Sequence, residues 1–128
     1  MSKKLKISKL LNRIMLINCK TILFSSIDDI VFIKSDDVYV QVFNPQGSEL
    51  IKGTLKKIIK LLPKYFIHSH KSYIINAKHI VRIDISKPCK YTAVMDIEEV
   101  TAKDNKIKEP VQIPITKKAY KKLEDMFS

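Results

Sequence analysis

Short runs of β-branched and aromatic residues recur along almost the whole chain, and clusters of turn-forming residues separate them. Such side chains favour strands because they pack well on a pleated surface. DIVFIK at 29–34 and VYVQVF at 38–43 are typical, and Asn-Pro-Gln-Gly at 44–47 is a strong turn signal. With 128 residues, the chain has the length of one domain. The pattern therefore predicts one mainly β domain.

The individual elements can be placed from the same signals. We expect strands at 13–17, 21–24, 29–34, 38–43, 49–52, 65–68, 72–75, 79–85, 91–97 and 111–115, with connections at 86–88 and 103–106. Apolar residues at helical spacing predict helices at 54–62, capped by Thr54 and ended by Pro63, and at 117–127, capped by Thr116. Residues 1–12 are expected to form a disordered basic N-terminal arm or a short helix, and residues 13–128 the main domain.

The chain is strongly basic, with 24 Lys and Arg against 13 Asp and Glu and a formal net charge of +11. This excess predicts attraction to polyanions and binding that weakens steeply as salt rises. Net charge alone does not separate DNA from RNA or from an anionic membrane surface. A lysine-rich chain with a merely solvated surface would carry the same excess.

No sequence signal predicts secretion or a membrane span. No apolar run approaches the roughly 18 residues needed to cross a bilayer. The basic N-terminus has neither the apolar segment nor the cleavage site of a signal peptide. Cys19 and Cys89 lie far apart in the sequence, so we expect buried thiols in a reducing cytoplasm rather than a disulfide. The expected location is cytoplasmic.

The segment FIHSHKSYIINAKHIV, residues 66–81, combines strand-forming and cationic character. No Asp or Glu occurs between Glu49 and Asp84, although this stretch is rich in lysine. A cationic β segment with interleaved Ser, Asn and His suits a surface that holds a phosphate backbone and touches base edges. Lys71, flanked by His70 and Ser72, is the best candidate contact. The alternative is a solvated edge strand whose charges deter aggregation.

Several segments, in order along the chain, also match a known pattern. DDIVFIKS at 28–35 is similar to an acidic-plus-apolar strand DDI-x-x-I, YVQV follows at 39–42, and a short helix precedes Pro63. FIHSHKSYIIN at 66–76 resembles F-x-R-x-H-R-S-Y-x-V-N, IVRI at 80–83 continues that pattern, and IPITKK at 113–118 parallels x-P-V-S-R-R. From about residue 13 to the C-terminus, the chain resembles the LytTR-type DNA-binding domain, the output module of many bacterial response regulators.

The resemblance implies a mainly β, elongated fold of several antiparallel sheets with one or two short helices. It also implies that loops, rather than a recognition helix, enter successive major grooves of double-stranded DNA. The implied DNA contacts are Tyr39, Lys71 and the cluster Thr116, Lys117 and Lys118. Nothing before residue 13 could hold a receiver domain, so the chain is either a stand-alone regulator or a piece of a longer one.

This sequence has lysine at Lys71, Lys117 and Lys118, where the family pattern usually has arginine. Lysine lacks the planar fork that bonds guanine O6 and N7 together. We therefore expect phosphate affinity to survive better than base discrimination. Thr116 and the two lysines after it also begin a predicted helix, whose free N–H groups would favour a phosphate. An ordinary capped surface helix is the alternative.

The histidines of this segment have two interpretations. Alternation along a strand puts His68 and His70 on one face, where either could orient the neighbouring loop or contact DNA. As a metal pair they have no nearby carboxylate or thiolate to complete a coordination set, so no metal site is expected.

Other polar residues are expected to be structural. Asn76 is predicted to hold a turn through its side chain. Asp28 and Asp29 are predicted to fix a loop by hydrogen bonding. Asp36 and Asp37 would repel phosphate, so we expect them to shape the loop near Tyr39 or tune its selectivity.

The sequence contains no catalytic motif, no phosphate-binding glycine loop and no cysteine-pair motif. We therefore do not predict an enzyme, a cofactor or a small-molecule substrate. The leading hypothesis is a transcription regulator that binds promoter DNA, as a dimer or as paired monomers on direct repeats. A first alternative is a single-stranded nucleic-acid module that stacks bases on aromatic side chains. Its candidate platforms are Phe32, Tyr39, Phe43, Tyr65, Phe66 and Tyr73. A second alternative is a protein-interaction or membrane-surface module that uses the basic N-terminus.

Overall fold

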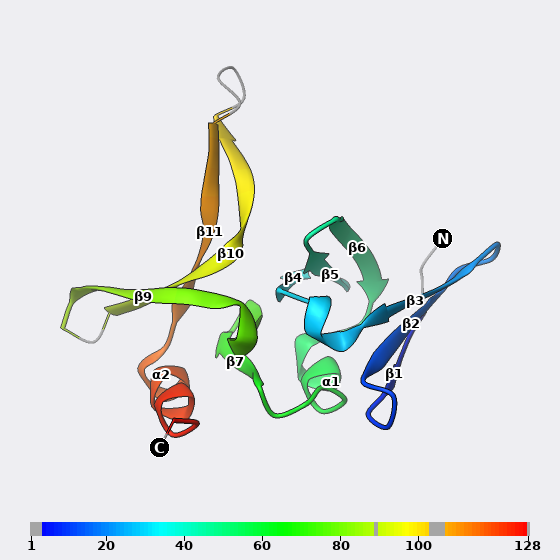
Figure 1. Ribbon diagram of the computed structural model, residues 1–128, viewed down its shortest axis with the longest axis horizontal. Coiled ribbons are helices and arrows are strands. Elements are labelled where there is room, and N and C mark those ends of the chain that lie inside the picture. The colour runs from blue at the N-terminus through cyan, green and yellow to red at the C-terminus, as the bar shows by residue number, and fades with distance from the viewer. Residues whose placement is uncertain (1–3, 89, 103–106, 128) are drawn as a thin grey trace.

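The computed structural model describes residues 4–88, 90–102 and 107–127 (Figure 1). Within these ranges the chain forms three antiparallel sheets and two short α-helices, which confirms the expected fold class. The sheets follow one another along the long axis of the molecule in Figure 1. The strands overlap every predicted range. The predicted connection at 103–106 lies outside the described residues.

The N-terminal sheet consists of β1 (Lys4–Ser8), β2 (Arg13–Ile17) and β3 (Ile22–Ser26), in that order. Residues 4–8 are therefore a strand, and the expectation of a short helix or disordered arm at 1–12 was wrong for this part. Leu5 and Ile7 alternate with lysines and lie opposite Leu16 and Ile14 of β2. Packing this alternate row against β2 favours the strand, and Leu10, in the turn after β1, is almost fully exposed.

The central sheet has five strands in the order β6-β5-β4-β8-β7. Their bounds are β4 (Phe32–Asp36), β5 (Tyr39–Asn44), β6 (Gly47–Lys52), β7 (Phe66–His70) and β8 (Tyr73–Asn76). A short 3-10 turn, η1 (Ile27–Asp29), precedes β4, and a second, η2 (Ala77–His79), follows β8. β4 begins later than predicted because η1, capped by the Ser26 hydroxyl, occupies the start of the expected strand.

The C-terminal sheet joins β9 (Ile80–Lys87), β10 (Lys90–Ala102) and β11 (Ile107–Ile115), in the order β11-β10-β9. The β10–β11 hairpin projects away from the body (Figure 1). β9 continues through much of the expected 86–88 connection. No helix in the described ranges is long and apolar enough to cross a bilayer.

The two faces of the central sheet contact different cores, so neighbouring residues of one strand can both be buried, as Phe32 and Ile33 are. Ile33 and Ile74 belong to a core shared with the N-terminal sheet and α1 (Leu55–Ile59). Their neighbours Phe32 and Ile75 point to the opposite face, into a core shared with the C-terminal sheet and α2 (Lys117–Glu124). The central sheet thus forms a middle layer between the two cores.

Both helices begin at the predicted cap. The Thr54 hydroxyl accepts a hydrogen bond from the Lys57 N–H at 3.3 Å, and the Thr116 hydroxyl accepts one from the Ala119 N–H at 3.1 Å. The helices are shorter than predicted, since α1 ends at Ile59 and α2 at Glu124.

Candidate nucleic-acid interface

Two hairpin turns lie side by side at one end of the central sheet. The β4–β5 turn contains Asp37 in the left-handed region, at φ +59°. The β7–β8 turn contains Lys71 and Ser72. Because β4 pairs with β8, the Ser35 N–H donates to the Ser72 carbonyl across the two hairpins at 3.0 Å. Turns that are far apart in the sequence are thereby held together.

The starts of both helices lie at the same end. The Gly53 N–H, just before α1, donates to the Val38 carbonyl of the β4–β5 turn at 3.1 Å. The Thr116 N–H, just before α2, donates to the Ser69 carbonyl of β7 at 2.8 Å. We call this end of the sheet the basic edge, which comprises residues 36–39, 53–56, 68–72 and 116–118. It contains every residue for which a DNA contact was predicted.

A shallow depression of about 280 Å³ in the basic edge brings together side chains from several of these segments. Tyr39 and Lys71, both predicted contacts, line it together with Asp37, Lys56 and His68. Lys56 was not among the predicted contacts, whereas His68 was expected either to orient the loop or to contact DNA. The cluster Thr116–Lys118 lies beside β7 and outside this depression.

His70 and Ser72 hold the β7–β8 turn. The Ser72 N–H donates to His70 Nδ1 at 3.3 Å, and the His70 ring lies 6.1 Å from the Tyr73 ring. This arrangement agrees with a histidine that orients the loop, whereas the exposed His68 faces the depression. Among the described residues, no three His, Cys, Asp or Glu side chains come together as a metal site.

The lysines of the basic edge are available to an anion. Within the described part of the chain, no ion pair engages Lys56, Lys71, Lys117 or Lys118, and all four are exposed. Unpaired, solvated cations that neutralise nucleic-acid phosphates displace the counterions condensed on the nucleic acid.

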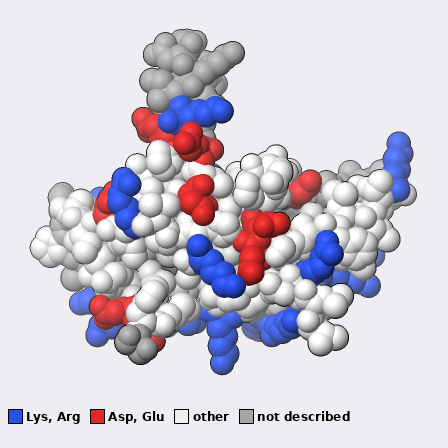
Figure 2. Space-filling view, in the orientation of Figure 1, with Lys and Arg blue, Asp and Glu red and all other residues white. Residues whose placement is uncertain are grey.

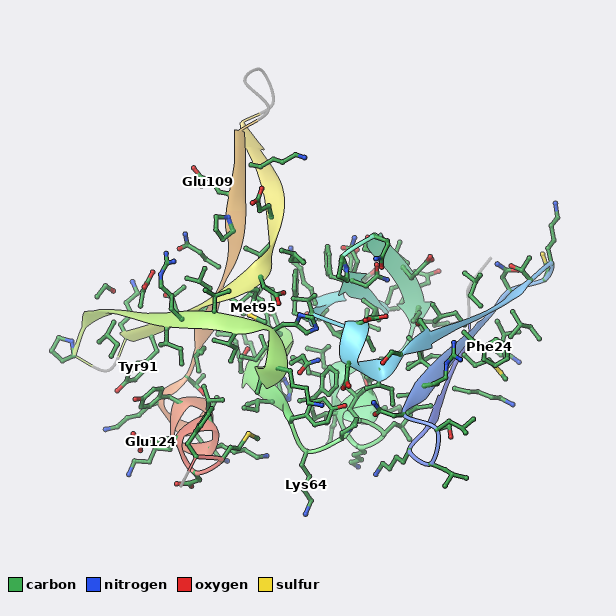
Figure 3. All side chains as sticks on the ribbon, viewed as in Figure 1. Phe24, Lys64, Tyr91, Met95, Glu109 and Glu124 are labelled. Atoms are coloured by element: carbon green, nitrogen blue, oxygen red, sulfur yellow. The ribbon has the colours of Figure 1, made fainter. Side chains whose placement is uncertain are left out.

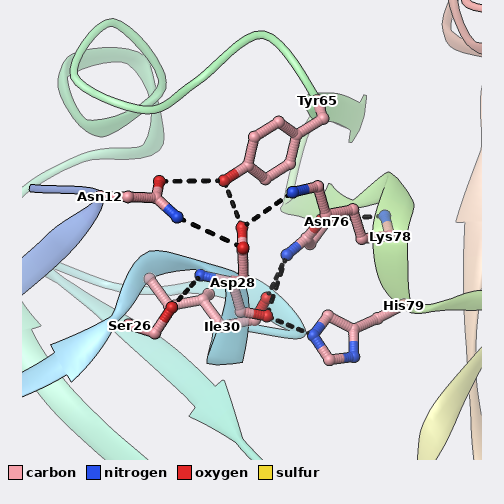
Figure 4. Close-up of polar contacts among 8 residues, drawn as sticks. All are labelled: Asn12, Ser26, Asp28, Ile30, Tyr65, Asn76, Lys78 and His79. Carbon is pink, nitrogen blue, oxygen red and sulfur yellow. Dashed lines mark hydrogen bonds and ion pairs between the residues drawn. The ribbon is translucent and has the colours of Figure 1, made fainter. Parts of the chain in front are cut away.

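The opposite end of the same sheet is closed by a polar network around Asp28 (Figure 4). Its carboxylate accepts hydrogen bonds from the Tyr65 hydroxyl and, at 3.3 Å, from Asn12 Nδ2. Lys78 Nζ lies 3.2 Å from the same carboxylate and 4.1 Å from the centre of the Tyr65 ring. We call Asp28 and its partners Asn12, Tyr65, Asn76, Lys78 and His79 the Asp28 network.

The backbone of Asp28 extends the network to the other sheets. Asn76, fully buried, donates from Nδ2 to the Ile30 carbonyl at 2.8 Å and to the Asp28 carbonyl at 3.5 Å. His79 Nε2 contacts that Asp28 carbonyl, and its Nδ1 lies 2.8 Å from an Asp96 carboxylate oxygen on β10. With Asn12 from the turn between β1 and β2, these contacts connect elements of all three sheets. The predicted structural roles of Asp28 and Asn76 are confirmed.

The network shifts the ionisation of its members. The hydrogen bond from Tyr65, helped by Lys78 and Asn12, lowers the pKa of Asp28 against the opposing effect of burial. Burial, together with the hydrogen bond to Asp28, raises the pKa of Tyr65 to about 12. Sequence reasoning did not find Tyr65, Lys78 or His79 because no local pattern relates them to Asp28.

The charges on the face shown in Figure 2 follow this division. Acidic groups gather over η1 and at the base of the β10–β11 hairpin, whereas most basic groups lie along the lower rim and at the ends. The Asp28 network therefore lies where acidic groups gather on this face, with Lys78 offsetting part of their charge.

Comparison with known proteins gives a consistent result. Residues 12–128 match the model of a family described as the LytTr DNA-binding domain. A similar solved structure is a Bacillus cereus LytTr DNA-binding domain from a protein described as a methyl-accepting/DNA response regulator, with a TM-score of 0.68 and 19% identity. The similarity covers 90% of this chain and 95% of that one. No curated protein matches the chain.

Proposed function

Because the chain belongs to the LytTr DNA-binding domain family, we propose that it is a bacterial transcription regulator that binds specific double-stranded DNA through its basic edge. The observation that carries this proposal is the convergence of two turns and a helix start at one end of the sheet. Hydrogen bonds between Ser35 and Ser72 and between Thr116 and Ser69 hold these segments together. A DNA partner also leads us to propose a cytoplasmic location.

In this mechanism, lysine–phosphate contacts provide most of the affinity. Lys71 and Tyr39 enter one major groove from the depression. Thr116, Lys117 and Lys118 bind the backbone or a second groove, where the free N–H groups at the start of α2 favour a phosphate oxygen. His70 and Ser72 act mainly by holding Lys71 in place, as their mutual hydrogen bond suggests.

Asp36 and Asp37 give the basic edge a means of discrimination. Both are exposed, Asp36 at the end of β4 and Asp37 in the turn that follows, and Asp37 lines the depression with Lys71. A carboxylate repels phosphate but accepts a hydrogen bond from cytosine N4 in the major groove. We propose that this turn favours a cytosine near the base that Lys71 contacts. Two copies of the domain would bind direct repeats at a promoter, as a dimer or as paired monomers.

The alternative of a single-stranded binder that stacks bases on aromatics has little support. Phe32 and Phe66 are buried, and Phe43 stacks on Phe32 with ring centres 4.2 Å apart. Tyr65 belongs to the Asp28 network. Of the six candidate platforms only Tyr39 is among the exposed apolar residues, at 37%. A single exposed ring is a poor stacking surface.

Selection from a random double-stranded DNA library at physiological salt tests the proposal. We expect a short motif, often repeated, that the protein binds at least on the order of tens of times more tightly than a scrambled duplex. Equal, salt-sensitive binding to every duplex would contradict sequence specificity. Tighter binding to a single strand of equal length would favour the alternative.

A further inference from the structure

The outer edge of the N-terminal sheet lacks the features that normally protect a strand from pairing. In the sheet order β1-β2-β3, β3 has β2 as its one partner strand among the described residues. Its sequence, Ile-Leu-Phe-Ser-Ser, has no charge, proline or bulge, which are the usual blocks against added strands. Ile22, Leu23 and Phe24 are about half exposed, at 52%, 49% and 57%. An edge of this kind is a template for another strand.

The face that points away from the core adds a cationic and apolar surface beside this edge. Lys6 of β1, Met15 of β2 and Phe24 of β3 form one row across the sheet. The Arg13 guanidinium lies 5.8 Å from the centre of the Phe24 ring. An apolar hollow of about 130 Å³ opens here, lined by Lys6, Leu11, Arg13, Met15, Phe24 and their neighbours. Figure 3 labels Phe24 at this end of the molecule.

Charge identifies the kind of partner. The sequence has no Asp or Glu before Asp28, so every ionised side chain of this sheet is cationic. Duplex DNA would satisfy the cations but not Ile22, Leu23 and Phe24. An anionic membrane would satisfy the cations and the apolar side chains but could not pair with the backbone of β3. An extended peptide that alternates carboxylate and apolar side chains can pair with the cations, cover the apolar side chains and bond to the backbone of β3.

We propose that β3 and the adjoining face of Lys6, Arg13 and Phe24 bind an acidic, extended segment of a partner protein, which adds a strand beside β3. Alternation along that strand directs its carboxylates toward Arg13 and the cationic face, and its apolar side chains toward Leu23 at the rim of the core. The surface is separate from the basic edge, so a regulator bound to DNA keeps it free for a second protein.

The test uses the full chain and a fluorescent peptide of alternating Glu and Val, with fluorescence anisotropy as the readout. A peptide of alternating Lys and Val is the charge control. We expect Lys6→Glu and Phe24→Ala each to weaken binding of the acidic peptide about tenfold or more. The matched controls are Lys64→Glu, in an exposed loop, and Phe127→Ala, near the C-terminus. Each control should change the affinity for the acidic peptide by less than about twofold. Binding to duplex DNA should persist in the Phe24→Ala variant.

Three results would overturn the proposal. Equal losses from Lys6→Glu and Lys64→Glu would mean that only net charge matters. If the peptide does not bind and sedimentation shows a dimer that Phe24→Ala abolishes, the occupant of this surface is a second copy of the chain. If the peptide does not bind but phosphatidylglycerol vesicles do, and Lys6→Glu abolishes vesicle binding, the partner of this surface is a membrane. None of these results depends on whether the basic edge recognises a DNA sequence.

Discussion

The two ends of the central sheet use polar residues in opposite ways. At one end, the Asp28 carboxylate and carbonyl are bonded to partners from other elements, and Asn76 is buried among them. At the basic edge, the lysines are exposed and have no ion pair among the described residues. The strands between the two ends are the same, so the difference lies in the side chains at the strand termini.

This contrast separates residues that maintain the fold from residues that are free to bind. A satisfied, partly buried network resists change because breaking one bond leaves another polar group without a partner. An unpaired surface lysine costs little to replace in the free protein. Substitutions at the Asp28 network should therefore lower stability, and substitutions at the basic edge should lower DNA affinity.

Asn76→Ala should have the largest effect. It leaves the Ile30 carbonyl and the Lys78 N–H without their hydrogen bonds to Asn76, at a cost of about 2–4 kcal/mol in the free energy of unfolding. Urea unfolding measures the loss. Asn44→Ala removes a similar turn bond to Gln46 at an exposed site and should cost clearly less. Equal losses would mean that burial at Asn76 does not matter.

Tyr65→Phe should have an intermediate effect, about 1–2 kcal/mol at neutral pH, and should change the pH dependence of stability. The lowered pKa of Asp28 contributes stability at neutral pH that is lost as pH falls through the folded-state pKa. The Tyr65 pKa, raised to about 12, contributes stability that is complete below its ordinary value and lost as pH rises toward 12.

Tyr65→Phe should therefore reduce the loss of stability at low pH. It should also remove the part of the loss at high pH that comes from Tyr65. Thermal melting between acid and alkaline pH measures both. Tyr91→Phe is the matched control, because Tyr91 stacks on Tyr120 and lies outside the Asp28 network. A parallel pH profile for the two variants would rule out the assigned hydrogen bond.

Lys71→Ala should leave stability unchanged and reduce the affinity for the selected DNA motif by about 1 kcal/mol or more, with a smaller loss on a scrambled duplex. Lys64→Ala is a better control than Lys56→Ala, since Lys56 lines the depression with Lys71. Lys64 projects from the loop before β7, at the other end of that strand (Figure 3). Equal losses from Lys71→Ala on both duplexes would show that Lys71 contacts only phosphate.

Lys117→Ala should have the smallest effect, because a single phosphate contact is involved. We expect slightly weaker binding to all duplexes and a decrease of about one in the slope of log affinity against log salt. Titration at several salt concentrations measures the slope. A change in base preference with an unchanged slope would instead assign Lys117 to a base contact.

Local features of the fold were predictable from the sequence. The caps at Thr54 and Thr116 and the turn at Asn76 depend on side-chain bonds that reach only two or three residues along the chain. Strand propensity is local in the same sense. The N-terminal strand was missed because Leu5, Lys6, Leu10 and Leu11 were compatible with a short amphipathic helix. The pairing of Leu5 and Ile7 with β2, which makes the segment a strand, is a tertiary contact.

The sequence by itself determined which segments are strands, where the helices begin, the excess of positive charge and the family to which the chain belongs. Only the tertiary structure decided which polar residues meet. Tyr65 and His79 reach Asp28 across 37 and 51 positions, and the two turns of the basic edge adjoin because β8 lies between β4 and β7. Propensity and capping act within a few residues, whereas the order of strands depends on packing both faces of the central sheet at once.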